Sequence, residues 1–339
     1  SFLGADVQLD GVWTPLDTVT LVLGGGLIVD EQTLGETTRV ARSDGTAQEV
    51  DPGVDNTFVN PGLFVQGTWR ALEELLTLTG GVRYDYHNIY GSQVSGRFGA
   101  VSNPAEGLFL KALYGSAFKA PSPILLFGRP AQSGDIIGNE SLEPQYVHTV
   151  EGQVIYQPLR ALSLGTNLAY SYVENLAVFS RAGFNNVARN VAELGTVSWE
   201  TSLRGAFEDV VGGYVAYEML FSQRNNGDEG FQSTLLGDEA GVFPDLQLRV
   251  GLWAALAGAL QVSVETRYVG ARRASDLNVL ANNAPYELDP YLVLDARVGT
   301  TDLELLGEGR QTVLELIGRN LTGSEGVVPG EAGVDYPLA

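Results

Sequence analysis

The segment that decides the fold runs from Leu76 to Tyr86 and reads Leu-Thr-Leu-Thr-Gly-Gly-Val-Arg-Tyr-Asp-Tyr. Its even-numbered residues are apolar, aromatic or glycine, whereas its odd-numbered residues include Thr77, Thr79, Arg83 and Asp85. Successive side chains of a β-strand point to opposite faces, while a helix would spread these polar groups around its circumference. The segment is therefore predicted to be a strand with one apolar and one polar face.

The same alternation recurs along the whole chain. Leu63, Val65 and Trp69 fall on the face opposite Gln66 and Arg70, for example. Strands that cross a membrane need about 9–11 residues, against about five or six in soluble sheets, and most of the predicted strands have the longer span. The pattern predicts about fourteen strands, at approximately 5–13, 18–30, 58–70, 75–87, 92–101, 108–118, 145–157, 162–173, 196–207, 211–223, 246–255, 259–269, 291–299 and 311–320.

The connections between these strands alternate in length. Short turns are expected at 14–17, 71–74, 102–107, 158–161, 208–210 and 256–258. A further short connection, near 88–91, falls at the opposite end, among the long segments. Long polar segments are expected at 31–57, 119–144, 174–195, 224–245, 270–290 and 321–339. Short turns at one end and long loops at the other are typical of outer-membrane β-barrels. The predicted fold class is all-β, a transmembrane antiparallel up-and-down barrel.

Aromatic and charged side chains sort in the way that such a barrel requires. Rings at the long-loop ends, which would form an outer girdle, are Tyr84, Tyr86, Tyr114, Phe118, Tyr170, Tyr172 and Tyr268. Trp13, Trp69 and Phe207 fall at the short-turn ends. Charged residues share the opposite parity and are expected to line the lumen: Arg70, Arg83, Arg97, Lys111, Glu151, Glu200, Arg204, Glu218, Arg249, Glu265, Arg267, Asp295, Arg297, Glu315 and Arg319.

The composition excludes several classes of function. The 339 residues include 20 Lys plus Arg against 41 Asp plus Glu, a formal net charge of −21, which disfavours binding to nucleic acid. There is no cysteine, and no stretch reaches 18 consecutive apolar residues, so disulfides, thiolate metal sites and helical membrane spans are not expected. With only His87 and His148 and no Gly-x-Ser-x-Gly elbow, the chain is not expected to be an enzyme or to hold a cofactor.

Three parts of the chain carry a family resemblance. Leu76–Tyr86 ends in a Gly-x-Arg-Tyr-Asp pattern, and 318–321 followed by 329–337 looks like the end of a penultimate strand and its loop. Most specific are Tyr114–Ser122 and Gly138–Pro144, which are similar to the signature YGxxFRAPS…NxxLxPE. Lys119 replaces the usual arginine, and Gln145 replaces the glutamate that usually follows the proline. With these segments, the chain resembles the TonB-dependent outer-membrane receptors.

The resemblance implies a particular place for the chain in a larger barrel. Plugged outer-membrane transporters have 22 strands, and by direction the predicted strands match about strands 8–21. Residues 1–339 are then a partial barrel without the plug domain, and the start at Ser1 shows no signal peptide. The alternative is a complete fourteen-stranded barrel, in which Ala5–Trp13 must pair with Gln311–Asn320.

The resemblance also implies a function. A TonB-dependent receptor in the bacterial outer membrane, with its long loops outside, captures a scarce nutrient such as a ferric siderophore or cobalamin. Uptake is then energised by the TonB complex through the plug. The expected partners are therefore this complex, outer-membrane lipid and lipopolysaccharide, and a metal chelate or other small ligand. Two alternatives are a structural barrel of an envelope assembly and a passive fourteen-stranded channel.

Candidate ligand-binding residues lie in the long loops. Arginines and aromatic rings suit an anionic metal chelate, and they equally suit lipopolysaccharide phosphates. The candidates are Phe127, Arg129, Arg181, Phe184, Arg272 and Arg273. The acidic segment Asp44–Asp55 does not have the spacing of a calcium loop and is expected to be solvated, so no metal site is predicted.

Overall fold

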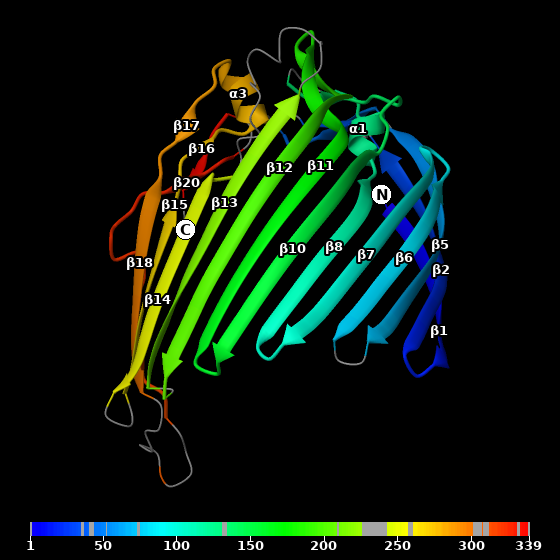
Figure 1. Cartoon of the computed structure of the whole chain (residues 1–339). Helices are drawn as coiled ribbons and strands as arrows, with labels where there is room; N and C mark the ends of the chain where they lie inside the picture. Colours follow the sequence, from blue (N-terminus) through cyan, green and yellow to red (C-terminus); the bar gives the residue numbers. More distant parts are fainter. Residues whose placement is uncertain are drawn as a thin grey trace.

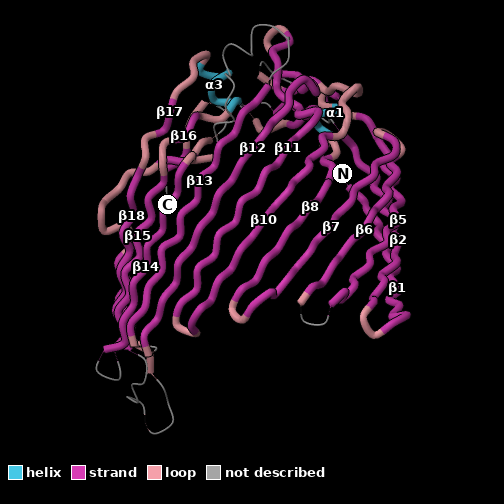
Figure 2. The backbone as a smooth tube through the Cα atoms, in the orientation of Figure 1, coloured by secondary structure: helices cyan, strands magenta, loops and turns pink. Residues whose placement is uncertain are grey.

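The computed structural model describes residues 2–34, 37–40, 44–51, 53–72, 75–130, 134–208, 210–225, 243–256, 260–300, 307, 312–330 and 333–337. Long antiparallel strands dominate it and form one curved wall (Figure 1). The tube in Figure 2 shows that most of these strands run through nearly the whole height of the wall. Within the described ranges, helices long and apolar enough to cross a membrane are absent.

The wall is a 15-stranded sheet in which β9 (Ile136–Ile137) lies off the main path and pairs in parallel with one strand. The remaining fourteen strands pair in chain order, each antiparallel to the one before it. They are β1 (Phe2–Leu16), β2 (Val19–Leu34), β5 (Val54–Leu72), β6 (Leu76–His87), β7 (Gly91–Ala105), β8 (Leu108–Lys119), β10 (Gln145–Leu159), β11 (Leu162–Ala182), β12 (Asn185–Phe207), β13 (Val211–Asn225), β14 (Leu246–Leu256), β15 (Leu260–Val269), β18 (Tyr291–Thr300) and β19 (Glu315–Gly318). The fourteen predicted strands are confirmed.

The register of the sheet places the charged residues on one face. Directly opposed residues of neighbouring strands share a face. Lys111 lies opposite Gln153, which lies opposite Asn167, and the row continues through Glu200 to Glu218. Five successive strands, β8 and β10 to β13, therefore contribute polar side chains to a single row. We call this side of the wall the polar face.

The other side of the wall is apolar. A second row runs from Tyr114 through Val150, Tyr170 and Val197 to Phe221 on the same five strands. All of these side chains are at least one-third exposed, and Val150 is 57% exposed. Soluble monomers rarely expose an apolar surface that continues over many strands. The alternation predicted from the sequence is thus present across the sheet, and we call this side the apolar face.

Short elements gather at the long-loop end of the wall. The helices α1 and α3 both lie at this end (Figure 1). The short elements are β3 (Thr37–Val40), β4 (Ala47–Asp51), α1 (Pro123–Phe127), β16 (Arg272–Arg273), α3 (Asp276–Asn282), β17 (Glu287–Leu288), β20 (Val327–Val328) and β21 (Tyr336–Pro337). Pro123 begins α1, where the missing N–H of proline is no loss to the helix.

The buried apolar core also lies at the long-loop end. Leu126, Leu142 and Ala188 form one cluster, and Ala274 and Val279 form another. Phe179, on β11, packs against both clusters. The loops around α1 and the loops around α3 are therefore linked through a single side chain of β11.

Three expectations about the connections need correction. The long loop predicted at 174–195 is wrong, because β11 runs to Ala182 and β12 begins at Asn185, which makes a hairpin that extends above its neighbours. The strand predicted at 311–320 is paired only from Glu315 to Gly318. Helix α3 falls in a segment for which only a polar loop was expected. The predicted turn at 256–258 lies largely outside the described residues.

Between the described strands, the closure that a complete fourteen-stranded barrel requires is not formed. Among the residues that the structure describes, β1 pairs only with β2, and β19 pairs only with β18. The pairing of Ala5–Trp13 with Gln311–Asn320, which the alternative of a complete fourteen-stranded barrel requires, is therefore absent from the described strands. The wall is an open sheet with two free edges.

The cluster around Leu126 predicts that two residues of α1 respond differently to truncation. Leu126→Ala should release the 123–143 segment from the sheet, because its side chain is 2% exposed and truncation of such a residue costs about 2–5 kcal/mol. Ile124→Ala is the matched control, because Ile124 is 47% exposed on the same helix. Amide hydrogen exchange should rise in this segment for the first variant only. Equal exchange in both variants would contradict the packing described here.

Candidate functional site

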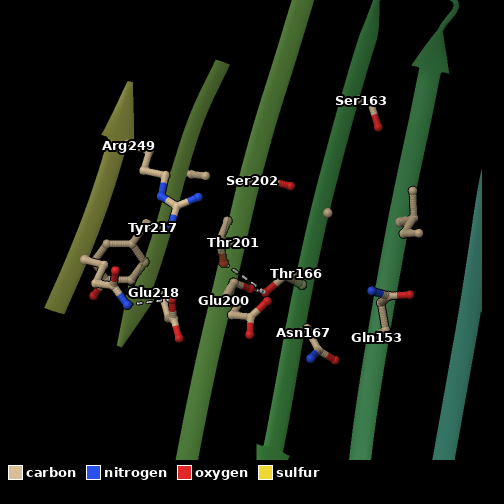
Figure 3. Close-up of a pocket in the computed structure, with 14 residues that line it drawn as sticks. Gln153, Ser163, Thr166, Asn167, Glu200, Thr201, Ser202, Tyr217, Glu218 and Arg249 are labelled. Carbon is tan, nitrogen blue, oxygen red and sulfur yellow. Dashed lines mark hydrogen bonds between the residues drawn. The ribbon is translucent and has the colours of Figure 1, made fainter. Parts of the chain in front are cut away.

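A hollow on the polar face is the first candidate site. It spans β10 to β14, has a volume of about 330 Å³ and is drawn in Figure 3. The row of small residues Gly165, Ser202 and Ala216 crosses three neighbouring strands and leaves this space open. Arg249 lies opposite Ala216 at the end of the row. Longer polar side chains surround the opening, including those of Gln153, Asn167, Glu200, Glu218 and Gln247.

The hollow is lined by two acidic side chains and one basic side chain. Glu200 and Glu218 are directly opposed on β12 and β13, and like charges in this position are destabilising. The Gln247 amide donates a hydrogen bond of 3.2 Å to Glu218 Oε2, which compensates part of the charge. The Arg249 guanidinium lines the same hollow. Amide, carboxylate and guanidinium groups together can bind a polar ligand or a polar protein surface. In the described part of the chain, no group of three or more His, Cys, Asp or Glu residues could hold a metal ion.

A tyrosine next to this hollow is held from three sides. The Tyr214 hydroxyl donates a hydrogen bond of 2.6 Å to Glu265 Oε2. The Arg204 guanidinium lies 5.9 Å from the centre of the Tyr214 ring, within the range of a cation–π contact. Gly251 lies opposite Tyr214, and a Cβ atom there would be 2.3 Å from the ring. Glycine at this position therefore allows the ring to lie flat over β14.

The family signature residues fasten the α1 segment to the extended hairpin. Asn139 Nδ2 donates to the Ala188 carbonyl at 2.9 Å, and Asn139 Oδ1 accepts from Ser141 Oγ at 2.6 Å. Asn190 accepts from the Glu143 N–H at 2.8 Å and donates back to the Glu143 carbonyl at 3.0 Å. β9 adds a parallel pairing with β12. The signature residue Asn139 therefore has a structural role.

Helix α3 organises the second group of loops. Ser275 caps its N-terminus by accepting a hydrogen bond from the Asn278 N–H. The fully buried Asn278 side chain donates to Asp335 Oδ1 at 2.9 Å and accepts from the Gly333 N–H at 2.7 Å. The Tyr286 hydroxyl donates to Asp335 Oδ2 at 2.8 Å. Desolvation raises the pKa of Tyr286, and this hydrogen bond acts in the same direction.

Both histidines have structural contacts. His87 stacks on Tyr90 with a ring separation of 3.9 Å, and its Nδ1 accepts the Ile89 N–H at 3.1 Å. His148 Nδ1 is 3.0 Å from the Tyr114 hydroxyl, within hydrogen-bonding distance.

Four of the predicted ligand-binding residues lie in two segments that pack together. Phe127 ends α1 and packs against the Leu126 cluster, and Arg129 follows it on the surface. Phe184 is at the tip of the β11–β12 hairpin and is 88% exposed. Gly134 donates its N–H to the Phe184 carbonyl at 2.8 Å, which joins the two segments. The backbone of Arg181 lies opposite Asn186 in the hairpin, but its side chain is outside the described part of the structure.

The other two predicted residues lie in the α3 group. Arg272 is 8% exposed and donates to the Val327 carbonyl, and its guanidinium is 5.5 Å from the centre of the Tyr291 ring. Arg273, its neighbour in β16, is half-buried. The six candidates are therefore divided between two loop groups. Of the residues of the hollow, only Glu200, Glu218 and Arg249 were predicted, as lumen-facing charges, because the proximity of the lining residues depends on the strand register.

The comparisons with known proteins establish the family. A family model described as "TonB dependent receptor-like, beta-barrel" matches residues 5–310, so the chain belongs to this family. A search of curated proteins finds no match.

Solved structures with the same fold include several transporters. The copper transporter OprC has a TM-score of 0.75 and 17% identity over 99% of this chain and 54% of its own. The siderophore receptor PirA from Acinetobacter baumannii has a TM-score of 0.73 and 14% identity, and the match covers 99% of this chain and 53% of PirA. A mutant of the ferric enterobactin receptor of Pseudomonas aeruginosa has a TM-score of 0.71 and 15% identity over 99% and 52%. The chain thus spans about half the length of the structures it matches.

The hydrogen bonds around α3 predict that Asn278 and Asn282 respond differently to substitution. Asn278→Ala should free the 333–337 segment, because it removes the bonds to Gly333 and Asp335 and leaves buried groups without partners. Asn282→Ala is the control, because this exposed residue makes a single 3.3 Å bond to the Gly333 carbonyl. Limited proteolysis should cut the last loop faster only in the Asn278 variant. Similar cleavage of both variants would show that the network does not hold the loop.

Proposed function

We propose that the chain forms the wall and outer mouth of an outer-membrane receptor that takes up a scarce nutrient. The observation that carries the proposal is a continuous sheet with one exposed apolar face and one polar face. In a bilayer the apolar face contacts lipid, and the polar face lines the interior of the barrel. The family of the chain supports this placement.

The long-loop end is the proposed site of ligand capture outside the cell. Its loops are fixed by two linked apolar clusters, so they present exposed groups on a stable base. Phe184 and Arg129 are both exposed there and remain candidates for binding an anionic chelate. Arg272 is a weaker candidate because its guanidinium already contacts the Val327 carbonyl and the Tyr291 ring. Lipopolysaccharide phosphates are a second ligand for exposed arginines of this end.

We further propose that the cargo is a metal chelate such as a ferric siderophore and that the TonB complex energises its passage. Support comes from the solved relatives, which are named as receptors for ferric enterobactin or siderophores and as a copper transporter. The free edges of β1 and β19 require hydrogen-bonding partners in a membrane. The numbering of the fourteen strands as 8–21 of a larger barrel remains a prediction.

Uptake by a deletion strain tests this function. Cells lacking the gene should lose accumulation of at least one radiolabelled chelate from a panel of ferric siderophores, cobalamin and copper complexes. The full-length gene should restore it, and collapse of the proton-motive force should abolish it. Unchanged uptake of every compound in the panel would favour a structural barrel of the envelope. Uptake that survives loss of the proton-motive force would instead favour a passive channel.

The membrane placement predicts opposite results for adjacent residues of β11. Leu168→Arg places a charge on the apolar face, where Leu168 is 58% exposed, and should cost about 2–4 kcal/mol if the site lies near mid-bilayer. Asn167→Arg is the matched control on the polar face and should cost little. Urea titration of the full-length protein folded into lipid vesicles measures the difference. Equal stability of the two variants would contradict a lipid-facing Leu168.

A further inference from the structure

Two arginines of the polar face are directly opposed. Arg249 on β14 lies opposite Arg267 on β15. Their other cross-strand neighbours in this row are Ala216 and Val293, which carry no charge. Directly opposed like charges destabilise a sheet unless another group compensates them.

Neither guanidinium has a compensating partner within the described residues. The structure gives Arg249 and Arg267 no hydrogen bond or ion pair, and Arg267 Nε is buried without a hydrogen-bond partner. Three other arginines form ion pairs that the structure describes, as Arg83 does with Asp85 at 2.6 Å. Buried N–H groups in native proteins are nearly always bonded, so an unpaired one indicates a partner that the described chain does not supply.

The nearest carboxylates of the same face are engaged by neutral donors. Glu218 accepts from the Gln247 amide at 3.2 Å, and Glu265 accepts from the Tyr214 hydroxyl at 2.6 Å. Asp295 lies opposite Glu265 and accepts the Asn320 N–H at 2.7 Å. These bonds orient the three carboxylates toward other groups, and none of them forms an ion pair with Arg249 or Arg267.

Arg249 of this pair lines the hollow on the polar face. Figure 3 shows the Arg249 side chain extending from β14 over the neighbouring strand. The short side chains of Ala216 and Ser202 leave room beside it. An anionic group can therefore approach the guanidinium from the interior side of the wall.

We propose that Arg249 and Arg267 form an anion-binding site for a carboxylate or phosphate group. Each guanidinium presents a planar set of N–H donors that matches the oxygen atoms of such a group. One bound anion would offset the repulsion between the two opposed guanidinium groups and provide an acceptor for the unpaired Nε of Arg267. The anion can come from a solute in the interior or from a carboxylate of another segment of the full-length protein. The site goes beyond the proposed uptake function and does not depend on it.

The test uses the full-length protein, purified from outer membranes in detergent, with inorganic phosphate as the probe. Calorimetric titration and thermal unfolding are measured for the wild type, R249Q, R267Q and R297Q. The last variant is the matched control, because Arg297 faces the same side but is already paired with Glu315. It should change stability slightly and leave phosphate binding unchanged.

Two outcomes support the site and distinguish the sources. If the anion is a solute, phosphate binds the wild type and its affinity falls about tenfold or more in R249Q and R267Q. If the anion is a protein carboxylate, phosphate does not bind, and R267Q lowers the melting temperature in a salt-dependent way.

The third outcome would overturn the proposal. Without a bound anion, R267Q removes only a like-charge repulsion and should leave or raise the melting temperature. That result, together with unchanged phosphate binding in both variants, would exclude the site. Neither readout involves nutrient uptake, so a receptor that imports none of the tested chelates would still give a clear answer here.

Discussion

The constraint on which the structure depends is that every peptide group within a bilayer needs a hydrogen-bonding partner in the protein. Strands meet it only by pairing with neighbours, and pairing in turn fixes which residues lie opposite each other. In this chain the pairing continues from β1 to β19, with local register shifts in several hairpins. It places Lys111, Gln153, Asn167, Glu200 and Glu218 in one polar row. The apolar side, the interior and the position of each loop all follow from this pairing.

The same constraint explains why the buried core lies at one end. One face of the sheet carries apolar side chains that suit contact with lipid, and the other carries polar side chains. The strands therefore do not need a buried apolar core. The loops need such a core, because loop backbone outside a sheet must be fixed by other contacts. Leu126 and Val279 are buried in two separate clusters there, and Phe179 on β11 joins them. Exposed residues such as Phe184 are thereby held on a rigid support.

The fourteen strands were predictable from the sequence because each carries its own alternation over many residues. The extended hairpin was missed because 174–195 contains mixed polar residues, and because the β9 and α1 segments that contact it are distant in sequence. Helix α3 had a local signal, since Ser275 precedes Asp276 as an N-cap residue does. The Arg249–Arg267 pair could not be predicted, because a parity pattern shows the face of a residue and not its cross-strand neighbour.

The central claim is that successive side chains of each strand alternate, with a period of two residues, between lipid and an aqueous interior. Spin labels placed singly from Leu162 to Val173 on β11, in the full-length protein in vesicles, test it most directly. Collision rates with oxygen should peak at the even-numbered positions, and those with a water-soluble nickel reagent should peak at the odd-numbered ones. A uniform profile, or one with a period near 3.6 residues, would contradict the account.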